Sequence, residues 1–343
     1  MSIGKIIVDW FEISGRDLPW RETKNPYYIW ISEVILQQTR IAQGIEYYYR
    51  FIERFPDVFQ LAEAEQDEVL KYWEGLGYYS RARNLHAAAN QIVNELEGKF
   101  PEHHAELIKL KGIGPYTSRA IGSFAFGNET GVIDGNVLRV MSRVLNDFSP
   151  IDQQRTRKSF QTIIDQWVKA VDSRRFNHGL MDIGSTICTP TQPGCMICPL
   201  EQECEGRKAG TLHLLPRKEK KLKRKIVYLN FYIILNSSSE FLIRQRSEKG
   251  IWGKLWEIPN EEVKEEAWTQ RITSHKSEHL MEFKHVLTHL DMMIHVFAVP
   301  FEESPQWDGV QFISKEKIPI FAFSKAVLKI FEAVLDKAME RLT

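Results

Sequence analysis

Hydrophobic side chains recur every three or four positions through most of the first 206 residues. Ile3, Ile6, Ile7, Trp10 and Phe11 follow this spacing and would lie on one face of an amphipathic helix. Similar patterns occupy residues 27–38, 45–55, 67–76, 81–96, 116–126, 136–145 and 159–171. Short breaks with Gly, Pro and Asp separate them, and no stretch has clear β character. We therefore predict an all-α domain over residues 1–206.

The pattern changes after residue 225. Extended sequence rich in β-branched and aromatic residues occupies residues 226–235, 241–246, 255–259 and 281–300. Helical spacing returns over roughly residues 261–273 and 322–340. These elements predict an α+β domain over residues 226–343, joined to the helical domain by a linker over residues 207–225.

The composition is that of an ordinary globular chain, since 43% of its 343 residues are hydrophobic and 26% are charged. It excludes collagen-like, low-complexity and fully disordered proteins. No apolar run approaches the ~20 residues of a membrane helix, so no membrane partner is expected. The first residues include Asp9 and Glu12 and no small-residue cleavage site, which argues against a targeting peptide. We expect a cytoplasmic protein, associated with the nucleoid if the source is bacterial.

Charge is balanced over the whole chain but not along it. The 45 basic and 45 acidic side chains cancel, whereas residues 207–225 alone carry a net charge of +8. This strip, which includes Lys220, Lys221 and Lys223, is either a solvated connector or a surface that contacts phosphates. Net charge gives no general indication of nucleic-acid binding, so any such indication must come from local surfaces.

The four cysteines are confined to one short segment. Cys188, Cys195, Cys198 and Cys204 follow the pattern C-x6-C-x2-C-x5-C. Four thiolates in one loop can enclose a tetrahedral zinc ion or an iron–sulfur cluster, and a disulfide pair is the third alternative. Clustered cysteines in a reducing compartment favour a metal centre over disulfides. The presence of only one C-x2-C pair departs from the usual zinc arrangement of two.

Residues 110–117 join two helical patterns and contain two glycines, Gly112 and Gly114. Glycine lets the backbone turn sharply and approach another chain closely. The following helix begins with free N–H groups and the positive end of its dipole, which can hold a phosphate without a charged side chain. The turn is therefore either a plain helix–helix connection or a contact for the DNA backbone.

Two acidic residues stand out by their surroundings. Glu33 lies within a strongly apolar stretch, which should desolvate its carboxyl group, raise its pKa and suit it to general acid catalysis. Asp134 precedes a predicted helix as its N-cap, where the helix dipole should keep its pKa low. An acid paired with a stabilising anion suits cleavage of a glycosidic bond through an oxocarbenium-like state.

Together these motifs resemble the helix–hairpin–helix DNA glycosylases of the endonuclease III type. Residues 30–39, with the pattern W-x-S-E-x2-L-Q-Q-T, are similar to the adenine DNA glycosylase branch, as are residues 18–21, 75–85 and 176–177. The resemblance is dense over residues 5–206 and looser beyond them. It implies a helix–hairpin–helix motif over about residues 110–121 and one [4Fe–4S] cluster held by the cysteines of segment 188–204. It further implies a Nudix-like lesion-recognition domain over residues 226–343.

The resemblance also assigns roles to residues. Glu33 would protonate N7 of an adenine flipped out of the duplex, and Asp134 would stabilise the sugar cation with support from Tyr116 and Asn136. The positions that would contact the adenine or the DNA are Arg16, Trp20, Arg21, Leu36, Gln38, Thr39, Tyr78, Gly112, Gly114, His178, Thr288 and His289. Among them, Gln38 and Tyr78 would enter the base stack as the adenine leaves it.

The implied enzyme is a monomer that binds double-stranded DNA and excises adenine opposite 8-oxoguanine or guanine in base excision repair. Bifunctional relatives carry a Schiff-base lysine eighteen positions before the catalytic Asp, where this chain has Tyr116. A phenol cannot form the imine, so a monofunctional glycosylase is expected. The alternatives are a glycosylase of different lesion specificity and a non-catalytic iron–sulfur DNA-binding protein.

Some features depart from the family pattern. His178 stands where Gln or Glu is usual, either as a satisfied helix histidine or as a pocket residue that shifts the pH dependence. Leu287 replaces the aromatic residue of the Phe-Ser-His loop that reads 8-oxoguanine, with Thr288 and His289 in the other two positions. The C-terminal domain also lacks the carboxylate array that would hold Mg²⁺ for pyrophosphate hydrolysis, so no nucleotide hydrolysis is expected.

Overall fold

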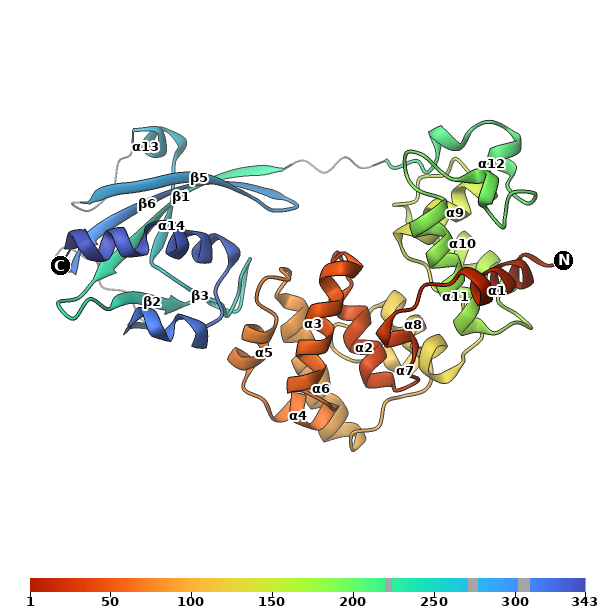
Figure 1. Cartoon of the computed structure of the whole chain (residues 1–343), viewed down its shortest axis with the longest axis horizontal. Coiled ribbons are helices and arrows are strands. Elements are labelled where there is room, and N and C mark those ends of the chain that lie inside the picture. Colours follow the sequence, from red (N-terminus) through yellow and green to blue (C-terminus); the bar gives the residue numbers. More distant parts are fainter. Residues whose placement is uncertain (220–223, 271–276, 302–308, 343) are drawn as a thin grey trace. The chain divides into compact units, whose positions relative to one another are not determined.

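The computed structural model describes residues 1–219, 224–270, 277–301 and 309–342. These residues form two compact units (Figure 1). The first unit contains residues 1–62 and 87–221, and the second contains residues 63–86 and 222–343. The chain therefore leaves the first unit after residue 62, contributes a helical segment to the second, and returns at residue 87.

The first unit is helical. Its helices are α1 (Ile3–Ser14), α2 (Pro26–Ile35), α3 (Ile41–Arg54), α4 (Val58–Glu63), the C-terminal part of α6 (Ser80–Leu96), α7 (His104–Leu107), α8 (Pro115–Phe126), α9 (Gly135–Val144), α10 (Gln154–Trp167), α11 (Ser173–Asp182) and α12 (Glu205–Lys208). No strand occurs among the described residues 1–219, which confirms the predicted all-α character. None of the helices that the structure describes is long and apolar enough to cross a membrane.

Helix α11 was not predicted from the spacing of hydrophobic residues. Neither α11 nor α4 was among the predicted helices, and α10 begins at Gln154 rather than at the predicted 159. Residues 176–180 of α11 are all buried. Several buried positions of α11 carry polar residues (Asn177, His178 and Asp182), so apolar side chains alone do not trace its buried face.

The core of the first unit lies where α1, α9, α10 and α11 meet. Ile7, Met141, Phe160 and Phe176 are fully buried there. Gly4 lets α1 approach α10, because a Cβ at this position would come within 2.1 Å of the carbonyl oxygen of Trp167. This packing fixes α9 and therefore also Asp134, the candidate catalytic residue that precedes its first turn.

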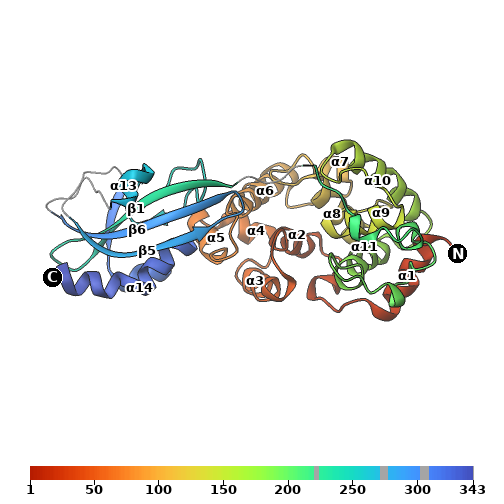
Figure 2. The same cartoon turned by 90° about the horizontal axis from the view of Figure 1, so that it is seen from above.

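The second unit contains a sheet with the strand order β3-β2-β1-β6-β5, in which β4 also pairs with β1 and β7 with β2. The strands are β1 (Lys225–Leu235), β2 (Phe241–Gln245), β3 (Trp256–Glu257), β4 (Asn260–Val263), β5 (Glu278–Val286), β6 (Leu290–Pro300) and β7 (Val310–Ile313). Helix α14 (Lys325–Leu342) runs along the sheet (Figure 2) and packs on one of its faces. Helix α13 (Glu265–Thr269) packs on the opposite face through Trp268.

Strand β1 is buried on both faces because it lies in the middle of the sheet. Val227, Leu229 and Phe231 pack toward α14, whereas Tyr232 and Ile234 belong to a smaller cluster on the opposite face. Two-sided burial favours a nearly continuous apolar run, and this run is what made the strand visible in the sequence.

The sheet also corrects one predicted element. The helix expected over about residues 261–273 is in fact strand β4 followed by the short helix α13. The remainder of that prediction, residues 271–276, lies outside the described residues. Strand β7 was not predicted, because four residues carry too little period-two pattern to separate a strand from a loop.

Residues 63–86 belong to the second unit through specific hydrogen bonds. The Asp67 carboxylate at the start of α5 (Gln66–Tyr72) accepts from Gln245 Nε2 at 2.9 Å and from Trp256 Nε1 at 3.1 Å. The Glu74 carboxylate accepts from the backbone N–H of Phe323 at 2.8 Å. A helical segment from the first half of the chain is thus part of the sheet-containing unit.

The described part of the predicted linker is packed against the first unit. Leu215 is buried, and its carbonyl accepts from Arg143 Nε at 3.2 Å. The carbonyl of Arg217 accepts from the backbone N–H of Ile151 at 3.0 Å. Residues 207–219 therefore contact the first unit at these points, while Lys208, Arg217 and Lys218 are exposed. Lys220, Lys221 and Lys223 lie outside the described residues, so the phosphate-contact hypothesis for them stays a prediction.

We predict that Asn177→Ala lowers the free energy of unfolding of the first unit by at least about 2 kcal/mol. The fully buried Asn177 amide accepts from the backbone N–H of Val132 and donates to Ser123 Oγ and to the carbonyl of Thr130, each at 2.9 Å. Alanine leaves these groups unsatisfied in the loop that leads to Asp134. Denaturant unfolding measures the change.

The matched control for this variant is Asn94→Ala, at an exposed position near the end of α6. We expect it to stay within about 0.5 kcal/mol of the wild type. Equal effects of the two substitutions would show that the buried amide does not hold the loop.

Candidate active site

A pocket of about 880 Å³ opens among the helices of the first unit. It is lined by residues of α2, α8, α9 and α11 and of the loops before α2 and α8. Thirteen residues singled out in the sequence line it together: Arg16, Trp20, Arg21, Glu33, Leu36, Gln38, Thr39, Gly112, Gly114, Tyr116, Asp134, Asn136 and His178. Of the remaining predicted DNA contacts, Tyr78, Thr288 and His289 belong to the second unit.

Glu33 lies on a helix that is buried around most of its circumference. Asn25 caps α2 by accepting from the backbone N–H of Tyr27, and Pro26 occupies the first turn, where proline is well tolerated. Glu33 is only 7% exposed. Burial raises the pKa of Glu33 to about 7, and nearby Asp134 adds to the rise. A hydrogen bond from Tyr116 and the charge of Arg21 only partly oppose this rise, so about half of the Glu33 carboxyl groups carry a proton at pH 7.

Tyr116 lies in the first turn of α8, where its hydroxyl hydrogen-bonds the Glu33 carboxyl group. Burial raises the pKa of Tyr116 well above its usual value, and the charges of Glu33 and Asp134 act in the same direction. The phenol is therefore a neutral hydrogen-bond donor beside the two acids.

Asp134 is the N-cap of α9, as predicted. One of its carboxylate oxygens accepts from the backbone N–H of Val137 at 2.7 Å, and the other accepts from Asn136 Nδ2 at 2.9 Å. The prediction that Asp134 keeps a low pKa is wrong, because burial raises its pKa above the usual value. The hydrogen bonds from Val137 and Asn136 and the charge of Arg139 oppose the rise without outweighing it.

Asn136 is itself held by Arg139, a residue that the sequence did not single out. Arg139 donates to Asn136 Oδ1 at 2.9 Å, to the carbonyl of Gly184 at 2.7 Å and to the carbonyl of Cys188 at 2.8 Å. A hydrogen-bonded path thus connects the Asp134 carboxylate to the first cysteine of the cysteine loop.

Asp182 was also missed, and it holds two arginines that line the pocket, Arg16 and Arg21. Its side chain is fully buried and accepts from Arg16 Nε at 2.9 Å and from both terminal nitrogens of Arg21 at 2.8 Å. Burial alone would raise the pKa of Asp182, but the hydrogen bonds and charges of the two arginines hold it at about 2. A buried carboxylate between two arginines fixes both guanidinium groups at the pocket.

His178 combines both roles that were considered for it. Its side chain is buried and stacks on Phe124 with ring centroids 4.0 Å apart, and it also lines the pocket. Burial lowers the pKa of His178 well below its usual value, and the charges of Arg21 and Arg174 lower it further. His178 is therefore a neutral hydrogen-bonding group at neutral pH rather than a charge that titrates there.

The turn between α7 and α8 has the backbone geometry that its glycines allow. Gly112 has a φ of +74°, in the left-handed region, and Gly114 is the N-cap of α8. Gln38 and Tyr78 also have positive φ values, +62° and +47°. Such conformations cost free energy in residues with a side chain and often mark functional positions.

In the second unit, Thr288 and His289 are exposed in the tight turn between β5 and β6. The backbone N–H of Leu287 donates to the carbonyl of Leu290 at 2.8 Å and closes this turn. Leu287, which replaces the family's aromatic residue, packs against the core of the unit. The hydroxyl groups of Thr288 and Tyr78 share a hydrogen bond, so two of the predicted DNA contacts lie side by side.

The four cysteines form no disulfide bond and line one largely apolar cavity between α9, α12 and the cysteine loop. Burial raises the pKa of Cys198 to about 11, and the other three cysteines contribute to the rise. Arg143 donates to Cys188 Sγ at 3.3 Å and to the carbonyl of Thr189 at 2.7 Å. The loop thus gathers four sulfurs around a common space beside a buried arginine.

The chain matches two protein-family models. Residues 31–171 match the HhH-GPD superfamily base excision DNA repair protein, and residues 230–333 match the NUDIX domain. The adenine DNA glycosylase of Buchnera aphidicola subsp. Baizongia pistaciae (strain Bp) is 37% identical over 295 residues, which cover 84% of this chain and 83% of that protein. The chain belongs to the adenine DNA glycosylase family.

Two further similarities agree with this family. The adenine DNA glycosylase of Buchnera aphidicola subsp. Acyrthosiphon pisum (strain APS) is 34% identical and covers 86% of this chain and 85% of that protein. The structure of a thermostable thymine-DNA glycosylase superposes with a TM-score of 0.56 at 28% identity, covering 60% of this chain and 95% of that chain. The predicted fold class, a helical glycosylase domain followed by a Nudix-like domain, is confirmed.

We predict that Glu33→Gln raises the free energy of unfolding by about 2–3 kcal/mol near pH 8 and by much less near pH 4. The folded-state pKa of Glu33 lies above its unfolded value, so its contribution to stability is complete below the unfolded pKa. That contribution is lost as the pH rises through about 7. Glutamine never ionises and escapes this loss. Denaturant unfolding over a pH series measures the difference.

The control is Glu46→Gln at an exposed position on α3. We expect no difference from wild type that grows across this pH range. A Glu33→Gln difference that stays constant from acid to alkaline pH would contradict the raised pKa.

Proposed function

We propose that the protein is a monofunctional glycosylase that removes adenine from A:8-oxoguanine or A:G mispairs in double-stranded DNA. One observation carries the proposal: Glu33, with a pKa of about 7, shares a pocket with the capped carboxylate Asp134. A proton donor and an anion at one site are what hydrolysis of an N-glycosidic bond needs. The family to which the chain belongs supports adenine as the base.

The proposed reaction begins when protonated Glu33 donates its proton to N7 of an adenine flipped into the pocket. The C1′–N9 bond then breaks, and its electron pair leaves with the base. The Asp134 carboxylate stabilises the positive charge that develops on the sugar. Water adds at C1′ and gives its proton to the Glu33 carboxylate, which leaves an abasic site and restores the acid.

The absence of strand cleavage rests on Tyr116. A lyase step needs a primary amine that attacks C1′. Among the described residues that line the pocket there is no lysine, and the phenol of Tyr116 is instead committed to a hydrogen bond with Glu33. The abasic strand is therefore the proposed product.

The DNA contacts of the proposal come from both units. Gln38 and Tyr78 enter the base stack, the turn at Gly112 and Gly114 holds the backbone, and Thr288 and His289 read the base opposite adenine. The two strained backbone positions and the exposed turn support these assignments. We further propose that the enzyme acts as a monomer, and that it works in the reducing cytoplasm, where its four thiols stay available.

We propose a [4Fe–4S] cluster as the occupant of the cysteine cavity. Zinc draws four sulfurs to about 2.3 Å from one centre. Among the described residues, the cysteines do not form a group close enough to hold a single ion, and they surround a cavity instead. When bound, the cluster supplies a rigid anchor with four covalent attachments. Arg143 places a positive charge beside Cys188, which suits an anionic cluster.

Cys198→Ser is expected to lower the iron and sulfide content of the purified protein to a small fraction of the wild-type content. Met196→Leu, an exposed substitution in the same loop, is the control and should retain both. Elemental analysis measures the two contents. Wild-type protein that contains zinc in place of iron would contradict the cluster assignment.

The proposed activity is tested with labelled duplexes under single-turnover conditions, with adenine placed opposite 8-oxoguanine, guanine or thymine. Strand breaks at the adenine should occur only after alkali and should be fastest opposite 8-oxoguanine. Glu33→Gln should bind the duplex and lose excision by at least about a hundredfold, whereas Glu46→Gln should keep both. Breaks without alkali, or excision by Glu33→Gln at the wild-type rate, would overturn the proposal.

A further inference from the structure

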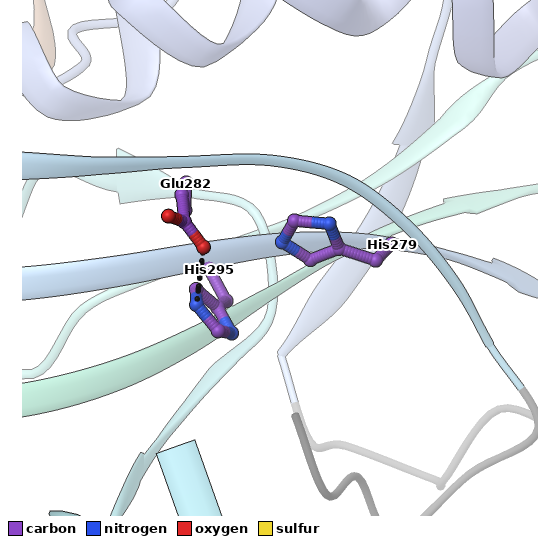
Figure 3. A group of neighbouring side chains, drawn as sticks. All are labelled: His279, Glu282 and His295. Atoms are coloured by element: carbon purple, nitrogen blue, oxygen red, sulfur yellow. Dashed lines mark ion pairs between the residues drawn. The ribbon is translucent and has the colours of Figure 1, made fainter. Parts of the chain in front are cut away.

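Three potential metal ligands gather on the sheet of the second unit. His279 and Glu282 come from β5 and His295 from β6, and one ligand atom of each lies within 4.8 Å of the other two (Figure 3). His295 Nε2 is 3.2 Å from the Glu282 carboxylate. The rings of His279 and His295 are 4.8 Å apart. Neither the proposed excision of adenine nor the proposed cluster uses this group.

A β-bulge brings His279 to the group. Glu282 lies opposite His295, and His279 lies opposite Phe297, with a register shift between His279 and Met281. In an unbroken strand, residues three apart such as 279 and 282 point to opposite faces. The inserted residue, Leu280, packs in the core toward α14, so His279 returns to the face that carries Glu282. Bulges re-aim side chains in this way and are frequent beside functional sites.

One ligand of the group is buried, and another is exposed to solvent. The His295 side chain is 2% exposed, whereas the Glu282 side chain is 52% exposed. Trp268 of α13 covers His295 with ring centroids 4.1 Å apart, and Phe297 lies 5.3 Å from His279. The aromatic rings form an apolar shell around the nitrogen ligands, and the exposed carboxylate provides a path for an ion to enter.

We propose that His279, Glu282 and His295 bind one divalent transition-metal ion, with Zn²⁺ as the occupant. Two imidazoles and one carboxylate are a donor set that zinc accepts with a water molecule in the fourth position. Mg²⁺ and Ca²⁺ prefer oxygen ligands and are disfavoured by two nitrogens. The ion ties the bulged end of β5 to β6. This site differs in chemistry from the carboxylate array of an active Nudix hydrolase, which the chain lacks.

Titration of the full-length, cluster-loaded protein with Zn²⁺ tests the proposal. The protein is first dialysed against a chelator, and Zn²⁺ is then added in competition with a chromophoric chelator while cluster absorbance is followed. We expect a single equivalent of Zn²⁺ per chain. Glu282→Gln should weaken binding by more than the ~10–100-fold that loss of an outer-shell partner costs. His295→Gln should abolish binding.

The control is His285→Gln on the same strand, whose ring packs on Trp252 and lies outside the group. It should bind Zn²⁺ as the wild type does. His295 is buried, so its replacement can disturb the sheet. The decisive comparison is therefore between the wild type and the exposed variant Glu282→Gln. Circular dichroism confirms that this variant is folded. X-ray absorption of the zinc-loaded protein should show nitrogen and oxygen ligands.

The proposal would be overturned if the wild type bound no Zn²⁺, or if Glu282→Gln bound Zn²⁺ as the wild type does. Sulfur in the zinc coordination shell would do the same, since it would place the ion at the cysteines. Excision of adenine is measured on the same preparations. Its loss in the wild type would count against the proposed function and leave the metal site standing.

Discussion

The removal of one carboxyl group from water is the constraint on which the candidate chemistry depends. Glu33 is buried on a helix with little polar surface, and this burial raises its pKa to about 7, so that much of it is protonated near neutral pH. The surroundings therefore have to hold Tyr116, Asp134 and Arg21 close to it while excluding solvent. Asp134 is buried as well, so the difference between the two acids comes from their partners. Asp134 accepts hydrogen bonds from Val137 and Asn136 at the start of a helix, whereas Glu33 accepts one from the Tyr116 phenol.

Two buried networks keep these partners in place. On one wall, Asp182 fixes the guanidinium groups of Arg16 and Arg21. On the other, Arg139 joins Asn136 to the backbone of the cysteine loop, and Gly184 leaves room for this contact because a Cβ there would come within 2.8 Å of Asn136. Loss of the loop would therefore be felt at Asp134 through hydrogen bonds rather than through charge.

The sequence predicted the residues that line the pocket better than it predicted the buried residues that hold them in position. Glu33 was visible because its neighbours are apolar, and Asp134 because it precedes a helix. The raised pKa of Asp134 was not visible, because burial depends on tertiary packing that a cap motif does not encode. Asp182 and Arg139 lie on helices where a charged residue usually faces solvent, and only the folded chain shows that they point inward. Residues 63–86 carry ordinary helical spacing, so nothing local assigns them to the second unit. The His279 group was missed because a bulge broke the period-two pattern.

Tyr78 lies in residues 63–86, the helical segment that belongs to the second unit. Its position there has a consequence for the proposed enzyme. Tyr78 has a left-handed backbone conformation and hydrogen-bonds Thr288. Its aromatic side chain and the exposed turn that contains Thr288 thus lie in the same unit. The residue proposed to enter the base stack and the turn proposed to read the opposite base therefore belong to the same unit. In the proposed enzyme, one unit would therefore carry both the side chain that opens the base pair and the turn that recognises its second base, which would couple the two steps.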